Sequence, residues 1–315
     1  MRYITISELS KMLKNNLWKI PHDIDLVVGI PRSGLFVASM IALYLNKRLT
    51  EIDSFVEGKI FSVGDSRSEI MRFSSIKKIL VVEDSISSGA SITAAKKKLK
   101  QIGGNYEFYY FAPIVTSAGS AMVSSYAEII DETRIFEWNL FHHSLLEEAC
   151  IDLDGVLCLD PPIDDDGKQY ISYIEHATPL FIPTATIGTI VTCRLEKYRP
   201  QTETWLALNN INYHRLIMLD MPNKAARINW GKHGEYKAEC FLKYGGKFFI
   251  ESSRYQAETI AQLSHKDVIC IETNSLIPAS APSIYQGFKK GIKTRYPKLF
   301  SALKRILKRS IISYF

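Results

Sequence analysis

The chain has 315 residues, with 39 Lys and Arg against 33 Asp and Glu, a formal net charge of +6 and a hydrophobic content of 46%. This length predicts two globular units, and the lack of any apolar run of about 18 residues excludes a membrane-spanning helix. The five cysteines are odd in number and widely spaced, so they form neither a zinc-binding pattern nor a disulfide framework. Since residues 1–14 contain no signal-peptide core, we expect a cytoplasmic protein.

The first functional signature is a strand followed by a tight loop. Residues 26–30 form an apolar run typical of a buried strand, and 36–45 is a predicted helix. On its own, such a segment is typical of an ordinary β-to-α turn. The loop residues between the two elements are Pro31, Arg32, Ser33 and Gly34.

A second strand, loop and helix follow further along the chain. Residues 79–82 are apolar and mostly β-branched, Glu83 and Asp84 come next, and 92–99 has a helical pattern. Such a loop presents backbone N–H groups and a helix N-terminus to a phosphate. The two carboxylates are poor phosphate neighbours, so we expect them to accept hydrogen bonds from vicinal ribose hydroxyls. The loop residues expected to hold the phosphate are Ser87, Ser88, Gly89, Ala90 and Ser91.

This second segment resembles the phosphoribosyl-pyrophosphate motif of type I phosphoribosyltransferases, in which two acidic residues precede a Ser/Thr-rich loop with a glycine. The resemblance implies that Glu83 and Asp84 hold the ribose and that residues 87–91 bind its 5-phosphate. The segment 26–34 resembles the pyrophosphate loop of the same family. The pyrophosphate contacts implied by that resemblance are Arg32, Ser33 and Gly34.

The polar segment 57–73 lies between these two motifs. A segment of this kind is either a surface hairpin or, by the same resemblance, a mobile lid over the reacting centre. A lid would exclude water, which competes for the oxocarbenium-like ribosyl cation. Lys59 and Arg67 are the contacts that the lid interpretation predicts.

Two aspartates open the second unit. Residues 150–156 read as an apolar strand interrupted by Asp152 and Asp154. Carboxylates on alternate residues point to one face, and both reach the C-terminal tip of a strand that is ending. The pattern resembles motif one of the haloacid dehalogenase superfamily. That resemblance implies that Asp152 is the nucleophile for the phosphoryl group, and that Asp154 protonates the leaving alcohol and later activates water.

Two later segments fit the next motifs of that superfamily in order. Residues 187–192 read as a strand ending in Thr192, which matches the hydroxyl donor to phosphate. Arg194 is a further candidate for phosphate binding. For the lysine that neutralises phosphate and nucleophile, we choose Lys237, with Lys232 in reserve.

The last motif should be a strand that ends in two acids. Residues 247–250 supply the strand, but Glu251 is followed by two serines, which departs from the usual form. The resemblance implies a Mg²⁺ cofactor, which suits a carboxylate and phosphate site. Its implied ligands are Asp152, Asp154 through its carbonyl, and Glu251.

Two segments surround this predicted phosphatase core. The insertion 159–181 is short, so the site lacks a large cap and suits a phosphate displayed on a bulky molecule. Residues 285–315 contain nine Lys or Arg and no acid, with apolar residues at helical spacing. A basic amphipathic helix is typical of a membrane-surface segment, and the alternative is a terminal helix docked on the protein. Nucleic-acid binding is not expected, because the main units are net acidic.

The predicted fold is therefore α/β in two domains. Residues 1–145 form a phosphoribosyltransferase-like parallel sheet, 146–280 a haloacid dehalogenase-like, Rossmann-like phosphatase with a minimal cap, and 281–315 a basic amphipathic tail.

This pairing is similar to dual-domain ribofuranosyltransferases of bacterial surface-polysaccharide assembly. The resemblance implies transfer of phosphoribose from phosphoribosyl pyrophosphate to a lipid-linked glycan, followed by removal of the 5-phosphate. Three alternatives stay open: a nucleobase transferase with nucleotidase activity, a non-catalytic phosphoribosyl pyrophosphate sensor, and a lone phosphatase with a relic first domain.

Overall fold

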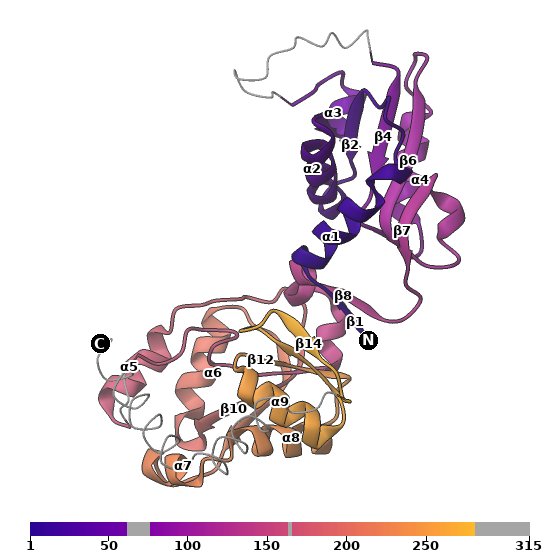
Figure 1. The fold of residues 1–315 in the computed structure, drawn as a ribbon. Helices are drawn as coiled ribbons and strands as arrows, with labels where there is room; N and C mark the ends of the chain where they lie inside the picture. Colours follow the sequence, from indigo (N-terminus) through magenta and orange to yellow (C-terminus); the bar gives the residue numbers. More distant parts are fainter. Residues whose placement is uncertain (62–75, 163–165, 281–315) are drawn as a thin grey trace. The chain divides into compact units, whose positions relative to one another are not determined.

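A computed structural model of the chain describes residues 1–61, 76–162 and 166–280. The chain divides into two compact units, Met1–Trp138 and the residues from Asn139 onward (Figure 1). The sequence placed this boundary a few residues later, between 145 and 146. Most of the predicted lid and the whole predicted tail, 281–315, lie outside the described residues. No helix in the described ranges is long and apolar enough to cross a membrane.

A six-stranded parallel sheet forms the first unit, in the order β3-β2-β4-β6-β5 with β7 paired to β6. This confirms the parallel α/β sheet predicted for the first part of the chain. A separate parallel pair joins the beginning and the end of the unit, β1 (Arg2–Ile4) with β8 (Arg134–Phe136). The six strands are β2 (Leu26–Gly29), β3 (Arg48–Glu51), β4 (Lys78–Val82), β5 (Ser85–Ile86), β6 (Glu107–Val115) and β7 (Ser125–Ile129).

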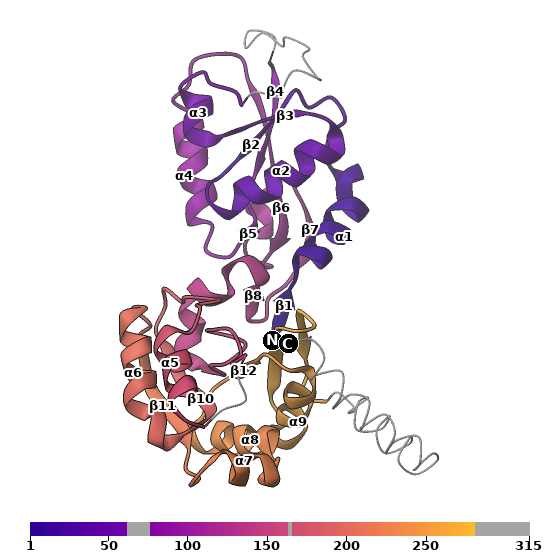
Figure 2. The same cartoon turned by 90° about the vertical axis from the view of Figure 1, so that its left-hand side faces the viewer.

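Helices cover both faces of this sheet (Figure 2). Side chains of α1 and α2 pack on one face with Val27, Leu80 and Phe111, and those of α3 and α4 pack on the other with Val28 and Ile79. This split follows from the strand period of two, because neighbouring residues point to opposite faces. The helical segments are α1 (Ile6–Asn16), η1 (Leu17–Lys19), α2 (Ser33–Leu45), α3 (Ile52–Val56), α4 (Ala90–Leu99) and η4 (Ser120–Met122).

The second unit holds another six-stranded sheet, in the order β11-β10-β9-β12-β13-β14. All neighbours are parallel except β13 and β14, which pair antiparallel. The strands are β9 (Ala149–Ile151), β10 (Ile187–Leu195), β11 (Tyr213–Leu219), β12 (Phe248–Glu251), β13 (Asp267–Cys270) and β14 (Ser275–Ile277). The helical segments are η5 (Glu137–His142), η6 (Ser144–Glu148), α5 (Lys168–His176), η7 (Glu196–Tyr198), α6 (Arg199–Leu208), α7 (Lys224–Trp230), α8 (His233–Tyr244) and α9 (Arg254–Ser264).

The core of the second unit is apolar and places the predicted motifs at strand ends. Phe241 of α8 and Ile260 of α9 pack against Cys150, Val191 and Phe249 of the sheet. Two predicted strands differ from the observed ones. The strand predicted over 150–156 ends at Ile151, since the chain turns there, and the strand predicted over 187–192 continues to Leu195.

Candidate functional sites

The two predicted loops of the first unit meet at neighbouring strand ends. The loop 31–34 follows β2 and the acidic pair follows β4, and these strands are adjacent and parallel. A Cβ atom added to Gly34 would lie 2.8 Å from the carbonyl oxygen of Val82 and 3.0 Å from the Cα of Glu83. Only a glycine allows this approach. The structure therefore brings the predicted pyrophosphate loop, with Arg32 and Ser33, next to the predicted ribose site.

Glu83 is buried and Asp84 is partly buried. Glu83 is 6% exposed; its Oε1 accepts a hydrogen bond from the Asp84 amide at 3.1 Å. Its buried Oε2 has no hydrogen-bond partner among the described residues. Burial, and then the charge of Asp84, raise the pKa of Glu83 to about 8. Burial likewise raises the pKa of Asp84. A carboxyl pair with unused acceptor capacity suits a ligand that offers hydroxyl donors.

The predicted phosphate loop leads into a helix N-terminus. Gly89 has a φ of +73° and precedes the first turn of α4, as a left-handed residue that favours glycine. The Ala90 amide donates to the Ser88 hydroxyl at 3.4 Å. The loop presents exposed side chains and a helix N-terminus, which is the geometry expected for an anion. The exposed loop residues are Ser87, Ser88, Ala90 and Ser91.

Trp138 is a site residue that the sequence analysis missed. Its indole Nε1 donates to Asp84 Oδ2 at 3.3 Å, and its half-buried ring stacks on Phe136 at a centroid distance of 4.8 Å. Phe36, just after the loop 31–34, contacts the same ring at 5.8 Å. The edge of an aromatic ring therefore lies beside the acidic pair. No local sequence signal ties Trp138 to Asp84, because they are 54 residues apart.

In the second unit, one buried lysine joins two predicted site residues. Asp152 follows β9, and Glu251 ends the adjacent β12. The ammonium of Lys237, in α8, lies 2.8 Å from Asp152 Oδ2 and 2.7 Å from Glu251 Oε2. All three side chains are buried. The choice of Lys237 over Lys232 therefore fits this geometry, since Lys232 is exposed at the start of the helix.

This buried triad has two carboxylates for one ammonium. Burial and the neighbouring Glu251 raise the pKa of Asp152, and Lys237 opposes them. Burial disfavours the charge of Lys237, but the charges of Asp152 and Glu251 outweigh burial and raise its pKa. Thr192 is fully buried within β10, and its Oγ1 accepts the Arg194 amide at 3.1 Å, which leaves its proton available to a phosphate oxygen.

Asp154 and Arg194 form a second ion pair that sequence reasoning did not foresee. The Nε of Arg194 lies 3.1 Å from both carboxylate oxygens of Asp154, and its Nη2 lies 2.6 Å from Oδ1. The guanidinium is completely buried. Burial alone raises the pKa of Asp154, but the charge and hydrogen bonds of Arg194 reverse this and lower it. Arg194 thus binds a carboxylate here, where the sequence expected it to bind phosphate.

The predicted metal ligands are brought together only in part. Both carboxylate oxygens of Glu251 already have partners. Its Oε2 is paired with Lys237, and its Oε1 accepts hydrogen bonds from the Ser252 hydroxyl at 3.2 Å and the Ser253 amide at 3.1 Å. In the described ranges, no group of three or more His, Cys, Asp and Glu side chains could hold a metal ion. The donors that fit Mg²⁺ are the Asp152 carboxylate and the Asp154 carbonyl. Mg²⁺ often binds through one or two carboxylates with waters and substrate phosphate.

A second residue missed from the sequence is Asp160. A Cβ atom at Gly155 would lie 3.2 Å from Asp160 Oδ2 and 2.7 Å from Ser252 Oγ. Burial, then the charges of Asp154 and Glu251, raise the pKa of Asp160, while Lys237 opposes them. The short insertion therefore returns a carboxylate to the edge of this site.

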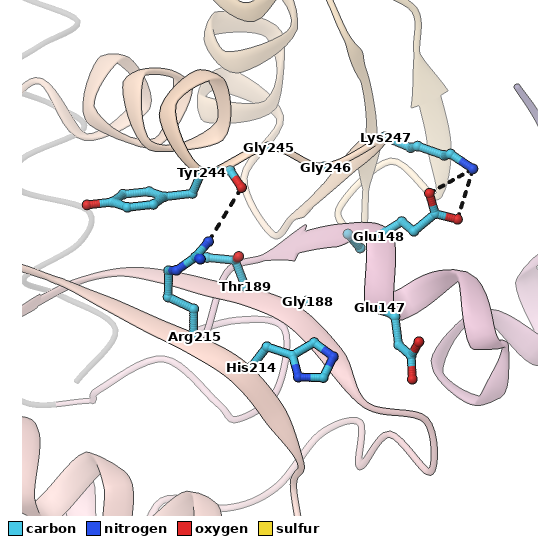
Figure 3. Close-up of a pocket in the computed structure, with 11 residues that line it drawn as sticks. Glu147, Glu148, Gly188, Thr189, His214, Arg215, Tyr244, Gly245, Gly246 and Lys247 are labelled. Atoms are coloured by element: carbon cyan, nitrogen blue, oxygen red, sulfur yellow. Dashed lines mark hydrogen bonds and ion pairs between the residues drawn. The ribbon is translucent and has the colours of Figure 1, made fainter.

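A groove of about 470 Å³ lies at the amino ends of the strands of the second sheet (Figure 3). It is lined at the beginnings of the strands, by Thr189, His214 and Lys247 among others, whereas the predicted catalytic residues follow strand ends. Lys247 is paired with Glu148 at 2.7 Å. Arg215 donates to the Tyr244 carbonyl at 3.4 Å, so two of the basic side chains that line the groove are engaged by the protein itself, and we assign no ligand to it.

Comparison with known proteins gives structural matches only. No protein-family model matches the chain, and no curated protein matches it. Xanthine-guanine-hypoxanthine phosphoribosyltransferase of Helicobacter pylori is 18% identical with a TM-score of 0.34, over 44% of this chain and 92% of that chain. Orotate phosphoribosyltransferase of Aeropyrum pernix is 21% identical with a TM-score of 0.26, over 37% and 63%. A chain of the Pnkp1/Rnl/Hen1 complex is 12% identical with a TM-score of 0.28, over 86% and 87%. Because these TM-scores are below 0.5, we argue function from the residues of this chain.

Proposed function

We propose that the chain is a two-step enzyme that adds a ribofuranosyl group to an acceptor. In the first unit, an acceptor hydroxyl attacks C1 of phosphoribosyl pyrophosphate, and the bond from C1 to the pyrophosphate oxygen breaks. Pyrophosphate leaves and the 5-phosphate stays on the product. In the second unit, Asp152 attacks that phosphate, and hydrolysis of the aspartyl phosphate releases inorganic phosphate.

The observation that carries the transfer step is the contact between the loop 31–34 and the acidic pair. Gly34 lies against Glu83, so groups for pyrophosphate and for ribose hydroxyls converge on one small region. The loop 87–91 provides a helix N-terminus for the 5-phosphate. This arrangement supports phosphoribosyl pyrophosphate as the substrate.

The phosphatase step is supported by the buried triad of Asp152, Lys237 and Glu251. An ammonium at 2.8 Å orients the nucleophile and offsets negative charge as a phosphate approaches. Thr192 adds a hydroxyl donor. Mg²⁺, when bound at Asp152 and the Asp154 carbonyl, would supply further neutralisation of the phosphate charge.

The acceptor is proposed from the combination of the two steps. An enzyme that makes nucleotides retains the 5-phosphate, whereas a glycan with plain ribofuranose requires its removal. We therefore propose a surface-glycan intermediate as the acceptor. The basic composition of residues 285–315 supports a lipid-carried acceptor at a membrane surface, since each Lys or Arg contributes about 1 kcal/mol near an anionic leaflet.

One observation favours a second candidate, a nucleobase acceptor. The half-buried ring of Trp138 beside Asp84 is suited to stacking on a planar base. A nucleobase transferase with nucleotidase activity would use that ring directly.

The test uses Asp152→Asn protein with phosphoribosyl pyrophosphate, Mg²⁺ and membrane extract of the source cells. We expect mass spectrometry to detect a phosphopentose-modified glycan lipid that loses phosphate when wild-type protein is added. The matched control, Asp152→Asn combined with Asp84→Asn, should form no such product. Formation of a nucleotide from added bases, with no modified lipid, would favour the second candidate.

A further inference from the structure

The carboxylate of Asp154 is not free to move protons in the phosphatase site. Arg194 binds both of its oxygens through Nε and Nη2, and the hydroxyl of Tyr173 lies 3.1 Å from Oδ1. Releasing Asp154 toward a substrate would leave the completely buried guanidinium without its counter-charge. Breaking a buried ion pair in this way is strongly unfavourable. The carboxylate of Asp154 therefore serves as the partner of Arg194. The proposed reaction still needs a general acid and base.

A tight turn after the nucleophile brings another carboxylate to the site. The Gly155 amide donates to the Cys158 carbonyl at 2.7 Å, and Leu157 and Cys158 amides both donate to the Leu153 carbonyl. Gly155 has a φ of +76°, which favours glycine. The Leu159 amide is then held by the Thr178 carbonyl at 3.0 Å, and Asp160 follows directly. These hydrogen bonds therefore fix the position of the backbone that leads into Asp160.

Asp160 lies beside the turn that follows the proposed nucleophile. Its Oδ2 and the Ser252 hydroxyl both lie beside Gly155, the residue after Asp154. The charged groups that act on it are Asp154 from the turn after β9, Glu251 from β12 and Lys237 from α8. Its side chain remains exposed to solvent. It therefore has access to water.

We propose that Asp160 is the acid–base residue of the phosphatase step, in place of Asp154. This inference rests on the proposed phosphatase function of the second unit. As Asp152 Oδ bonds to phosphorus and the phosphorus–oxygen ester bond breaks, the carboxyl of Asp160 gives its proton to the leaving alkoxide. Asp160 then takes a proton from the water that attacks the aspartyl phosphate, and the bond between phosphorus and Asp152 breaks. Inorganic phosphate leaves and both side chains return to their initial state.

Partial burial and two neighbouring carboxylates raise the pKa of Asp160, with Lys237 opposing. This shift favours the protonated form that the first half-reaction needs. It supports the assignment but is not its basis, which is the fixed Asp154 and the placement of Asp160.

The test compares leaving groups in the full-length protein with Mg²⁺. The substrates are ribose 5-phosphate, whose alkoxide needs a proton to leave, and 4-nitrophenyl phosphate, whose phenolate does not. For Asp160→Asn we expect a loss of about 10²–10⁴-fold in kcat on ribose 5-phosphate. With 4-nitrophenyl phosphate we expect a rapid first-turnover burst of nitrophenolate followed by slow turnover, because the water in the second half-reaction is not activated.

Glu175→Gln is the matched control, an exposed carboxylate in the same insertion, and should behave like wild type on both esters. Asp160 is on the surface, so circular dichroism of Asp160→Asn should be unchanged. Equal losses on the two esters without a burst would overturn the inference, as would recovery of activity at high Mg²⁺, which would indicate a metal ligand. Wild-type activity in Asp160→Asn would overturn it while leaving the phosphatase proposal intact. A wild-type protein inactive on both esters would overturn the phosphatase proposal itself.

Discussion

Replacing Glu83 with Gln should stabilise the first unit in a pH-dependent way. Burial, together with the charge of Asp84, raises the pKa of Glu83 from 4.5 to about 8 in the folded protein. Between these two values the folded protein keeps a proton that the unfolded chain has lost. Stability therefore falls as pH rises through this window, and the full loss is present above about pH 8. Glutamine carries no charge at any of these pH values, so Glu83→Gln escapes the loss.

The size of the effect follows from the shift. At 1.36 kcal/mol per pKa unit, the upper bound is about 5 kcal/mol, and we expect about 2–4 kcal/mol because Glu83 and Asp84 titrate as a pair. The assay is native-state hydrogen exchange of amides in β2 and β4, which reports the opening free energy of the first unit. Exchange is measured at pH 5 and pH 8.5 and corrected for intrinsic rates.

We expect Glu83→Gln to resemble wild type near pH 5 and to be clearly more stable at pH 8.5. Glu107→Gln, at an exposed glutamate that begins β6, is the control and should show no such pH-dependent gain. A difference between Glu83→Gln and wild type that does not change with pH would refute the reasoning, because it would show that burial of charge at Glu83 is not the cause.

Three further substitutions test the packing of the sites. Lys237→Met should cost the second unit about 3–5 kcal/mol, since two buried carboxylates lose their cation. Asp152→Asn leaves Lys237 paired with Glu251 and should cost less, and equal losses in urea unfolding would contradict the triad as described. Gly34→Ala brings a Cβ to 2.8 Å from the Val82 carbonyl oxygen, so we expect a loss of about 1–3 kcal/mol of stability and weaker phosphoribosyl pyrophosphate binding. If calorimetric titration finds that Gly34→Ala binds phosphoribosyl pyrophosphate with wild-type affinity, the loop 31–34 can shift without affecting the site.

Local sequence signals predicted the elements that carry the motifs. The apolar run at 26–30 corresponds to β2, and the helical pattern at 92–99 lies within α4, because burial and periodicity act over neighbouring residues. The boundary between the units was harder to place. The division after Trp138 falls within η5, a short 3₁₀ segment with no change in composition to mark it.

Pairings between distant side chains could not be predicted. Arg194 and Asp154 are 40 residues apart, and their ion pair depends on the register between β9 and β10. A superfamily pattern assigns Asp154 a proton-transfer role but carries no information about a cation that holds it. Asp160 was missed for a similar reason, since its approach to Gly155 depends on the turn 153–158 and on the chain that returns at Thr178.

The two sites balance their buried carboxylates in different ways. In the second unit, Lys237 and Arg194 supply cations to the acids. In the first unit, Glu83 accepts a hydrogen bond from a backbone amide and Asp84 accepts one from a neutral indole, and burial raises the pKa of both carboxyls. A ligand that donates hydroxyl hydrogen bonds prefers the ionised carboxylates, so its binding favours loss of the proton that the raised pKa of Glu83 retains. The affinity of this site for ribose hydroxyls should therefore rise with pH up to about 8, over the range in which the empty unit loses stability, and ligand binding would offset that loss. Burial of Glu83 and Asp84 thus lowers the stability of the unit without ligand, and it leaves carboxylate oxygens available to accept hydrogen bonds from the substrate.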